Sequence, residues 1–138
     1  MNNKFHLAFK VKDLESTIIF YNLILGCKLG RQTEHWVDFN FFGHQLSVHV
    51  SDKIPKLDYC GNVENLKVPI PHFGCLVENK VFSTIQESLE KHKVDFIIKP
   101  QKRYKNKIGE QKTMFFLDYS NNPLEFKCFK NELDIFKD

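Results

Sequence analysis

Apolar and polar residues alternate from Lys4 to Val11, in the order Lys-Phe-His-Leu-Ala-Phe-Lys-Val. A period of two residues is typical of a β-strand that buries one face. The period then lengthens to three and four residues, which predicts a helix with Leu14, Ile18, Tyr21 and Leu25 on one face. The chain therefore begins with a predicted strand followed by a predicted helix.

A capping residue and a glycine mark the two ends of this predicted helix. Asp13 is a good helix cap, and Gly26 is suited to end the helix. Three further runs predict strands at 27–33, 35–41 and 45–50, with a turn at Gly43-His44 between the last two. The polar stretch that follows contains Pro, Gly and Asn, so we predict a linker over about residues 52–70.

The same order of elements returns in the second half of the chain. A strand is predicted at Pro71–Val77, followed by Asn79 as a helix cap and a helix over Val81–His92. Strands are then predicted at 94–99, 111–117 and 123–129, with turn residues at 118–122. The pattern is β-α-β-β-β, written twice.

Register supports this duplication. The first strands of the two copies align with an offset of 66 residues, which pairs His6 with His72. The closing strands align with an offset of 76, which pairs His49 with Glu125. We predict an α+β fold of one domain, residues 1–138, in which two modules (about 4–51 and 71–130) pair into one cupped mixed sheet around a central cavity.

Composition places the chain among ordinary globular proteins. It has 138 residues, 42% of them hydrophobic and 27% charged, and no apolar run near the length of a bilayer span. No apolar signal segment follows Met1, so a cytoplasmic protein is expected. The four cysteines show no paired spacing and are interpreted as reduced thiols.

The positive charge is mild and local. The net charge is +3, and the cations gather in the basic run Lys99–Lys107. The run is short and has a single aromatic residue, Tyr104, so we interpret it as a solvated loop. Neither nucleic acid nor a membrane is predicted as a partner.

Three residues at repeat-related places carry the candidate chemistry. His6 and His72 lie in matching first strands, and Glu125 lies in the last strand. Any one of them alone would most often be an ordinary surface residue, but two imidazoles and a carboxylate on inward faces suit a divalent metal. Fe(II) is the first choice, and Mn, Ni, Co or Zn would also suit these ligands.

At this point the chain resembles the vicinal oxygen chelate superfamily, which includes glyoxalases, bleomycin-resistance proteins and extradiol dioxygenases. The resemblance covers about residues 4–130. It rests on Phe-His-Leu-Ala-Phe-Lys-Val followed by Asp-Leu, on Phe-Tyr-x-x-x-Leu-Gly at 20–26, on Pro-His-Phe-Gly at 71–74, and on Asp-x-x-x-Asn-Pro-Leu-Glu at 118–125. It implies two β-α-β-β-β modules around one metal, with His6, His72 and Glu125 as ligands.

The resemblance also implies a role for His49, either as the acid/base residue of an extradiol dioxygenase or as a fourth ligand. We therefore expect a metal-dependent enzyme that chelates adjacent oxygens of a small molecule, with dioxygenase-like oxygenation as the first choice. The extradiol signature places Tyr where this chain has Phe115. Isomerisation of the glyoxalase or epimerase type and metal-free ligand sequestration of the bleomycin-resistance type are also compatible with the resemblance.

Aromatic residues complete the expected site. An apolar wall for the substrate is predicted from Trp36, Phe42, Tyr104 and Phe116. Exposed strand edges would also allow two chains to pair as a homodimer.

Overall fold

The elements follow one another in the predicted order in the computed structural model, which describes residues 2–138. The first module contains β1 (His6–Val11), α1 (Leu14–Ile18), η1 (Ile19–Ile24), β2 (Lys28–Gln32), β3 (Trp36–Phe41) and β4 (His44–Val50). The second contains β7 (Phe73–Leu76), α2 (Asn79–Lys91), β8 (Phe96–Arg103), β9 (Gln111–Leu117) and β10 (Pro123–Phe129). Two short strands, β5 (Gly61–Val63) and β6 (Leu66–Val68), lie between them, and η2 (Glu132–Asp134) follows β10.

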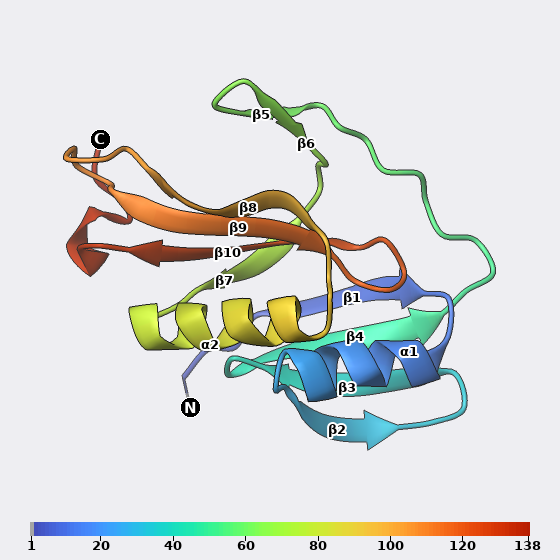
Figure 1. The fold of residues 1–138 in the computed structure, drawn as a ribbon. Helices are drawn as coiled ribbons and strands as arrows, with labels where there is room; N and C mark the ends of the chain where they lie inside the picture. Colours follow the sequence, from blue (N-terminus) through green and yellow to red (C-terminus); the bar gives the residue numbers. More distant parts are fainter. Residues whose placement is uncertain (1) are drawn as a thin grey trace. The chain divides into compact units, whose positions relative to one another are not determined.

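Each module forms a four-stranded mixed sheet of the same topology. The orders are β1-β4-β3-β2 and β7-β10-β9-β8, with the first pair parallel and the others antiparallel. The chain divides into two compact units (Figure 1): one runs to Lys56 and includes Asp118–Asn122, and the other contains Leu57–Leu117 and Pro123–Asp138. The α+β class and the repeated β-α-β-β-β order are confirmed, whereas one cupped sheet and a single domain stay predictions.

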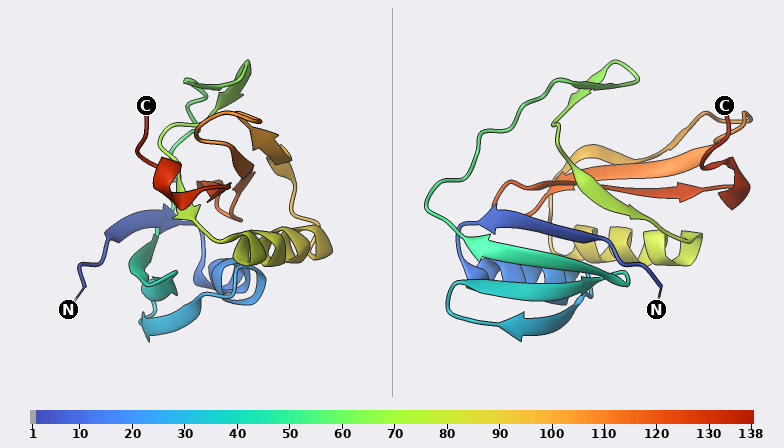
Figure 2. Two further views of the ribbon diagram at one scale, coloured as in Figure 1. Left: turned by 90° about the vertical axis from the view of Figure 1, so that its left-hand side faces the viewer. Right: turned by 180° about the vertical axis from the view of Figure 1, so that it is seen from behind.

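The first helix is capped as its sequence predicts and then widens. The Asp13 carboxylate accepts a hydrogen bond from the Ser16 amide at 2.7 Å. The helix continues as the π-helical segment η1 and ends before Gly26, whose φ of +76° is in the left-handed region that favours glycine. Tyr21 and Leu25 are buried as predicted. In Figure 2 this helical segment lies along one side of the first unit's sheet.

The second helix lies along one face of the second unit's sheet (Figures 1 and 2). Phe82, Ile85 and Leu89 are its buried residues, spaced three and four apart as an amphipathic helix requires. The predicted cap was wrong by one residue: Glu78 is the N-cap, its side chain does not bond to the helix, and Asn79 is the first helical residue.

The predicted linker over 52–70 contains a β-hairpin at 61–68 that the sequence analysis did not predict. Strands β5 and β6 pair in antiparallel fashion. Val68 is buried in a cluster with Ile98 and Phe115 of the sheet. These contacts of Val68 hold the hairpin against its own unit. They could not be predicted from the sequence, because the segment before Val68 is mostly polar.

The basic run begins inside a strand rather than a loop. β8 extends to Arg103, so the first half of Lys99–Lys107 is paired with β9. The Arg103 side chain is only 10% exposed and lies 3.6 Å from the Glu64 carboxylate in the hairpin turn. One cation of the run is therefore structural. In residues 2–138 no helix has the length and apolar character needed to cross a membrane.

The strand pairing corrects the register of the repeat. On the first sheet Ala8 is opposite Ser47, and on the second Gly74 is opposite Glu125. Because Ala8 and Gly74 are repeat-equivalent, the counterpart of Glu125 is Ser47 and not His49. The closing strands are thus offset by 78 residues instead of 76.

Candidate functional site

The centre of the candidate site is a histidine and a carboxylate that face each other in the second unit. His72 lies directly before β7, and Glu125 lies in the adjacent parallel strand β10. The Nε2 atom of His72 is 3.2 Å from Oε2 of Glu125. Gly74 allows this close pairing, because a Cβ atom there would collide with the backbone carbonyl of Glu125. The structure therefore brings together two of the three predicted ligands.

The other ring nitrogen of His72 determines which atom faces the carboxylate. Nδ1 is 2.8 Å from the carbonyl oxygen of Pro69. A carbonyl oxygen only accepts, so Nδ1 carries a proton and donates it. In the neutral ring, Nε2 then carries a lone pair that points at a carboxylate oxygen. Two such acceptors repel each other unless a proton or a metal ion lies between them.

The spacing of the two acceptors fits ligands of one cation. Two ligand atoms about 2.1 Å from a metal are about 3.0 Å apart at a right angle and about 3.4 Å apart at a tetrahedral angle. The separation of Nε2 and Oε2, 3.2 Å, falls in this interval. The donor set, one imidazole nitrogen and one carboxylate oxygen, suits the first-row divalent metals.

Neighbouring side chains hold Glu125 in place. The Thr113 hydroxyl donates to its Oε1 at 2.7 Å, and the Lys127 ammonium lies 3.9 Å from Oε2. Glu125 is 7% exposed, so these partners offset the cost of keeping a carboxylate away from water. The ring of Phe115 packs edge-on against His72, with centroids 4.7 Å apart. Phe115 thus supports the imidazole at the position where an extradiol dioxygenase would have Tyr.

Sequence reasoning did not identify Thr113. Its hydroxyl reaches Glu125 from the neighbouring strand β9, although the paired residue opposite Glu125 is Phe115. A polar residue in an otherwise apolar strand was the available signal, but only the strand register shows what this residue contacts.

The third predicted ligand, His6, lies in the first unit. It is exposed at the start of β1, where it is paired with Gln45 of β4. It lines a cavity of about 450 Å³ whose charged and polar residues include Lys4, Arg31, Asp38 and His44. Among residues 2–138, no three His, Cys, Asp or Glu side chains converge as a metal-binding group.

A buried carboxylate that the sequence analysis missed organises this cavity. Asp38, 6% exposed, accepts hydrogen bonds from Ser47 at 2.6 Å, Arg31 at 3.2 Å and Gln45 at 3.3 Å. Asp38 and Ser47 are directly opposite each other on β3 and β4. A lone Asp among the apolar residues of β3 was the signal that marked it.

His49 lies outside this network. It is exposed near the end of β4, opposite Lys10 and Trp36. Its ring is 6.4 Å from that of Trp36, and its predicted equivalence with Glu125 was wrong because Ser47 holds that place. Its catalytic role and its role as a fourth ligand remain predictions, and the alignment of His49 with Glu125 in the repeat no longer supports them.

The four predicted wall residues have different surroundings. Trp36 is half-buried under the Arg31 guanidinium, and Phe42 lies in a turn and lines a small cavity beside Gly26. Tyr104 is 45% exposed and accepts a hydrogen bond from Arg103. Phe116 is fully buried and stacks on Phe126, which is a packing role in place of the predicted contact with substrate.

Comparison with known proteins identifies the family. A crystal structure of a glyoxalase/bleomycin resistance protein/dioxygenase from Alicyclobacillus acidocaldarius is 31% identical, with a TM-score of 0.81 over 98% of this chain and 97% of that protein. The chain belongs to the vicinal oxygen chelate superfamily. No protein-family model matches the sequence.

Two other known proteins are also similar to this chain. The metallothiol transferase FosB of Lysinibacillus sphaericus (strain C3-41) is 26% identical over 134 residues, which is 96% of this chain and 87% of that protein. The fosfomycin resistance protein FosX of Listeria monocytogenes shares the fold, with a TM-score of 0.73 and 16% identity over 97% of this chain and 98% of its own. The similarity to the Alicyclobacillus protein is the one that shows the superfamily.

Proposed function

We propose that the protein is a metal-dependent enzyme that chelates adjacent oxygens of a small anionic substrate. The observation that carries this proposal is the His72–Glu125 pair, in which a ring nitrogen lone pair and a carboxylate oxygen face each other at 3.2 Å. A proton or a metal ion between the two atoms stabilises such a pair, and a divalent metal would be held by both. The superfamily membership supports the same conclusion.

We propose His6 as the third ligand, on the strength of its repeat-equivalence with His72 and of the family resemblance. Fe(II) remains the first metal to test, followed by Mn, Ni, Co and Zn. A metal held by two imidazoles and one carboxylate would polarise a bound oxygen as a Lewis acid. The chain's own residues orient the site: Thr113 holds Glu125, and Pro69 fixes the tautomer of His72.

The reaction that we propose first is transfer of a thiol to a small epoxide such as fosfomycin. The S–H group would add across the ring, so that a C–S bond forms, a C–O bond breaks and the oxygen takes a proton. The FosB relative, a metallothiol transferase by name, supports this choice. Lys127, with its ammonium 3.9 Å from Glu125, would attract an acidic group of the substrate.

Dioxygenase-like oxygenation is the second candidate, favoured by the description of the Alicyclobacillus relative. Two observations weigh against it. Phe115 replaces the tyrosine of the extradiol signature, and His49, the expected acid/base residue, is exposed near the end of β4. Isomerisation of the glyoxalase or epimerase type and metal-free ligand sequestration rank third and fourth.

Metal content and activity, measured on the same protein, test the proposal. The wild type, reconstituted with each metal in turn, is expected to hold about one equivalent, and Glu125→Gln is expected to lose it because an amide is a poor ligand for these cations. Glu87→Gln, an exposed change on α2, is the matched control. The loaded enzyme is then given fosfomycin with a small thiol, a catechol panel with oxygen, or methylglyoxal with glutathione.

Consumption of free thiol only in the presence of fosfomycin would support the transferase, and oxygen uptake with a diol would replace it by the second candidate. Thioester formation from methylglyoxal would indicate the isomerase type. A wild type that holds no more metal than Glu125→Gln would overturn the metal proposal and leave ligand sequestration.

A further inference from the structure

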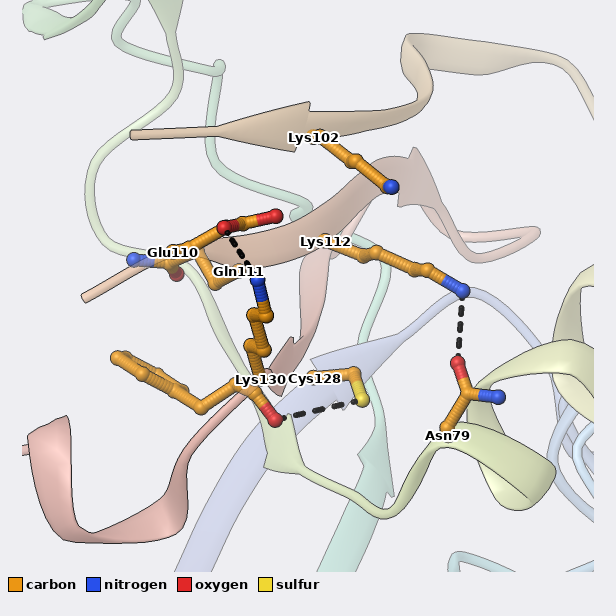
Figure 3. Close-up of a pocket in the computed structure, with 8 residues that line it drawn as sticks. Asn79, Lys102, Glu110, Gln111, Lys112, Cys128 and Lys130 are labelled. Atoms are coloured by element: carbon orange, nitrogen blue, oxygen red, sulfur yellow. Dashed lines mark hydrogen bonds and ion pairs between the residues drawn. The ribbon is translucent and has the colours of Figure 1, made fainter. Parts of the chain in front are cut away.

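A row of residues crosses the second unit's sheet on the face opposite the metal-site candidate. Lys102 of β8 is directly opposite Lys112 of β9, and Lys112 is directly opposite Cys128 of β10. Side chains alternate between the faces of a strand, and Lys112 follows this rule, because it bonds to the start of α2 while its neighbour Thr113 bonds to Glu125. Figure 3 shows Lys102 and Lys112 extending in the same direction.

These residues line a cavity of about 330 Å³, together with Asn79, Glu110 and Lys130 among others. The volume is in the range of small-ligand pockets. Cys128 carries a short side chain, which leaves space between the longer lysines around it. The cavity is therefore built from three strands and the first residue of α2 (Figure 3).

The charges in the cavity do not balance. Lys130 donates to the Glu110 carboxylate at 3.1 Å, so these two neutralise each other. Lys112 donates to the uncharged amide oxygen of Asn79 at 2.7 Å. Lys102 forms no hydrogen bond or ion pair among residues 2–138, although its charge, after a backbone hydrogen bond and the contact with Lys130, helps to lower the pKa of the Glu110 carboxyl. The lining therefore carries two more positive charges than negative ones.

Like charges directly opposite each other on neighbouring strands destabilise a sheet. Asn79, the first residue of α2, lines the cavity, and the free backbone N–H groups at a helix N-terminus carry a partial positive charge. An anion that binds between the lysines would remove the repulsion and accept hydrogen bonds from both ammonium groups.

We propose that this cavity binds a phosphate group, either free or carried by a small metabolite, between Lys102 and Lys112. The site is distinct from the proposed metal centre, because it lies on the other face of the same sheet. It does not depend on the proposed reaction. A phosphorylated ligand bound there would contact β9 and β10, the two strands that carry Thr113 and Glu125.

Titration with inorganic phosphate and with glycerol 3-phosphate, followed by amide NMR at constant ionic strength, tests the proposal. We expect saturable shifts at Asn79, Lys112 and Cys128, and smaller or absent shifts with chloride. Lys102→Gln and Lys112→Gln should each weaken binding about tenfold, the effect of one lost charge-assisted hydrogen bond. Lys91→Gln, an exposed change at the other end of α2, should leave binding unchanged.

Thermal melting gives a second measurement. Lys102→Gln is expected to melt higher than the wild type in buffer without phosphate, because it removes the cross-strand repulsion. Phosphate should raise the melting temperature of the wild type and not that of the double variant. Shifts that are equal for chloride and phosphate, or that Lys102→Gln and Lys112→Gln leave unchanged, would overturn the proposal, whatever the metal content of the protein.

Discussion

Among single residues, Asp118 shows how one side chain can fix a whole turn. It accepts hydrogen bonds from the Tyr21 hydroxyl at 2.8 Å and from the backbone amides of Ser120 and Asn122. Burial raises the pKa of its carboxyl, while these hydrogen bonds oppose the rise. Burial and the nearby carboxylate raise the pKa of Tyr21 well above its usual value, so this phenol stays a donor.

Replacing Tyr21 by Phe should lower the free energy of unfolding by about 1–3 kcal/mol at neutral pH, because a buried carboxylate loses a donor. Loss of the donor raises the folded-state pKa of Asp118 further. A carboxyl whose pKa is raised by folding lowers the free energy of unfolding at pH values above that pKa. The penalty should therefore shrink as the pH falls toward about 4 and the carboxyl takes up a proton. Chemical denaturation of both proteins at the two pH values checks this, and an equal difference at both would contradict it.

Among the secondary-structure elements, the parallel pair β7–β10 positions the candidate metal ligands. Leu124 to Lys127 are paired residue by residue with Phe73 to Leu76. The backbones of Gly74 and Glu125 are so close that a side chain on residue 74 would collide with the Glu125 carbonyl. The equivalent residue of the first module is Ala8, opposite Ser47, so the close contact is a feature of the second module alone.

Gly74→Ala should destabilise the protein by about 1–3 kcal/mol, as overpacked sites do, and it should also weaken metal binding because the backbone of Glu125 must move. The matched change Ala8→Gly should cost about 0.5–1 kcal/mol, the usual entropic penalty of glycine in a strand. Equilibrium unfolding and metal titration of the two variants give both quantities. Metal affinity that is equal in Gly74→Ala and in the wild type would show that this contact does not position the ligand.

For the molecule as a whole, a ligand that binds only the folded state raises its stability by mass action. The His72–Glu125 pair lies inside the second unit, so metal bound there must be released when that unit unfolds.

A hundredfold excess of metal over its Kd should therefore stabilise the wild type by about 2.7 kcal/mol, which is several degrees in Tm for a chain of this size. Chelator should reverse the gain. Scanning calorimetry with and without metal, on the wild type and Glu125→Gln, measures it. A variant that gains as much as the wild type would place the metal elsewhere in the molecule.

The sequence predicted those parts of the structure that depend on neighbouring residues better than those that depend on contacts between distant residues. Strands β9 and β10 begin and end at the predicted residues, because turn residues and a two-residue period mark them locally. The β5–β6 hairpin was missed, since its burial depends on Val68 meeting Ile98 and Phe115 from distant parts of the chain. His72 and Glu125 were predicted as neighbours, while Thr113 and Pro69 were not.

The sequence by itself determined the order of the elements, the duplication and the superfamily, because periodicity and short motifs depend only on residues that are close together in the chain. Only the tertiary structure decided which residues lie opposite each other. Side chains alternate between the two faces of a strand, so a shift of two residues keeps the face and changes which residue occupies a given place. The strand pairing put Ser47 in the place predicted for His49 by such a shift, and it set Lys102 opposite Lys112.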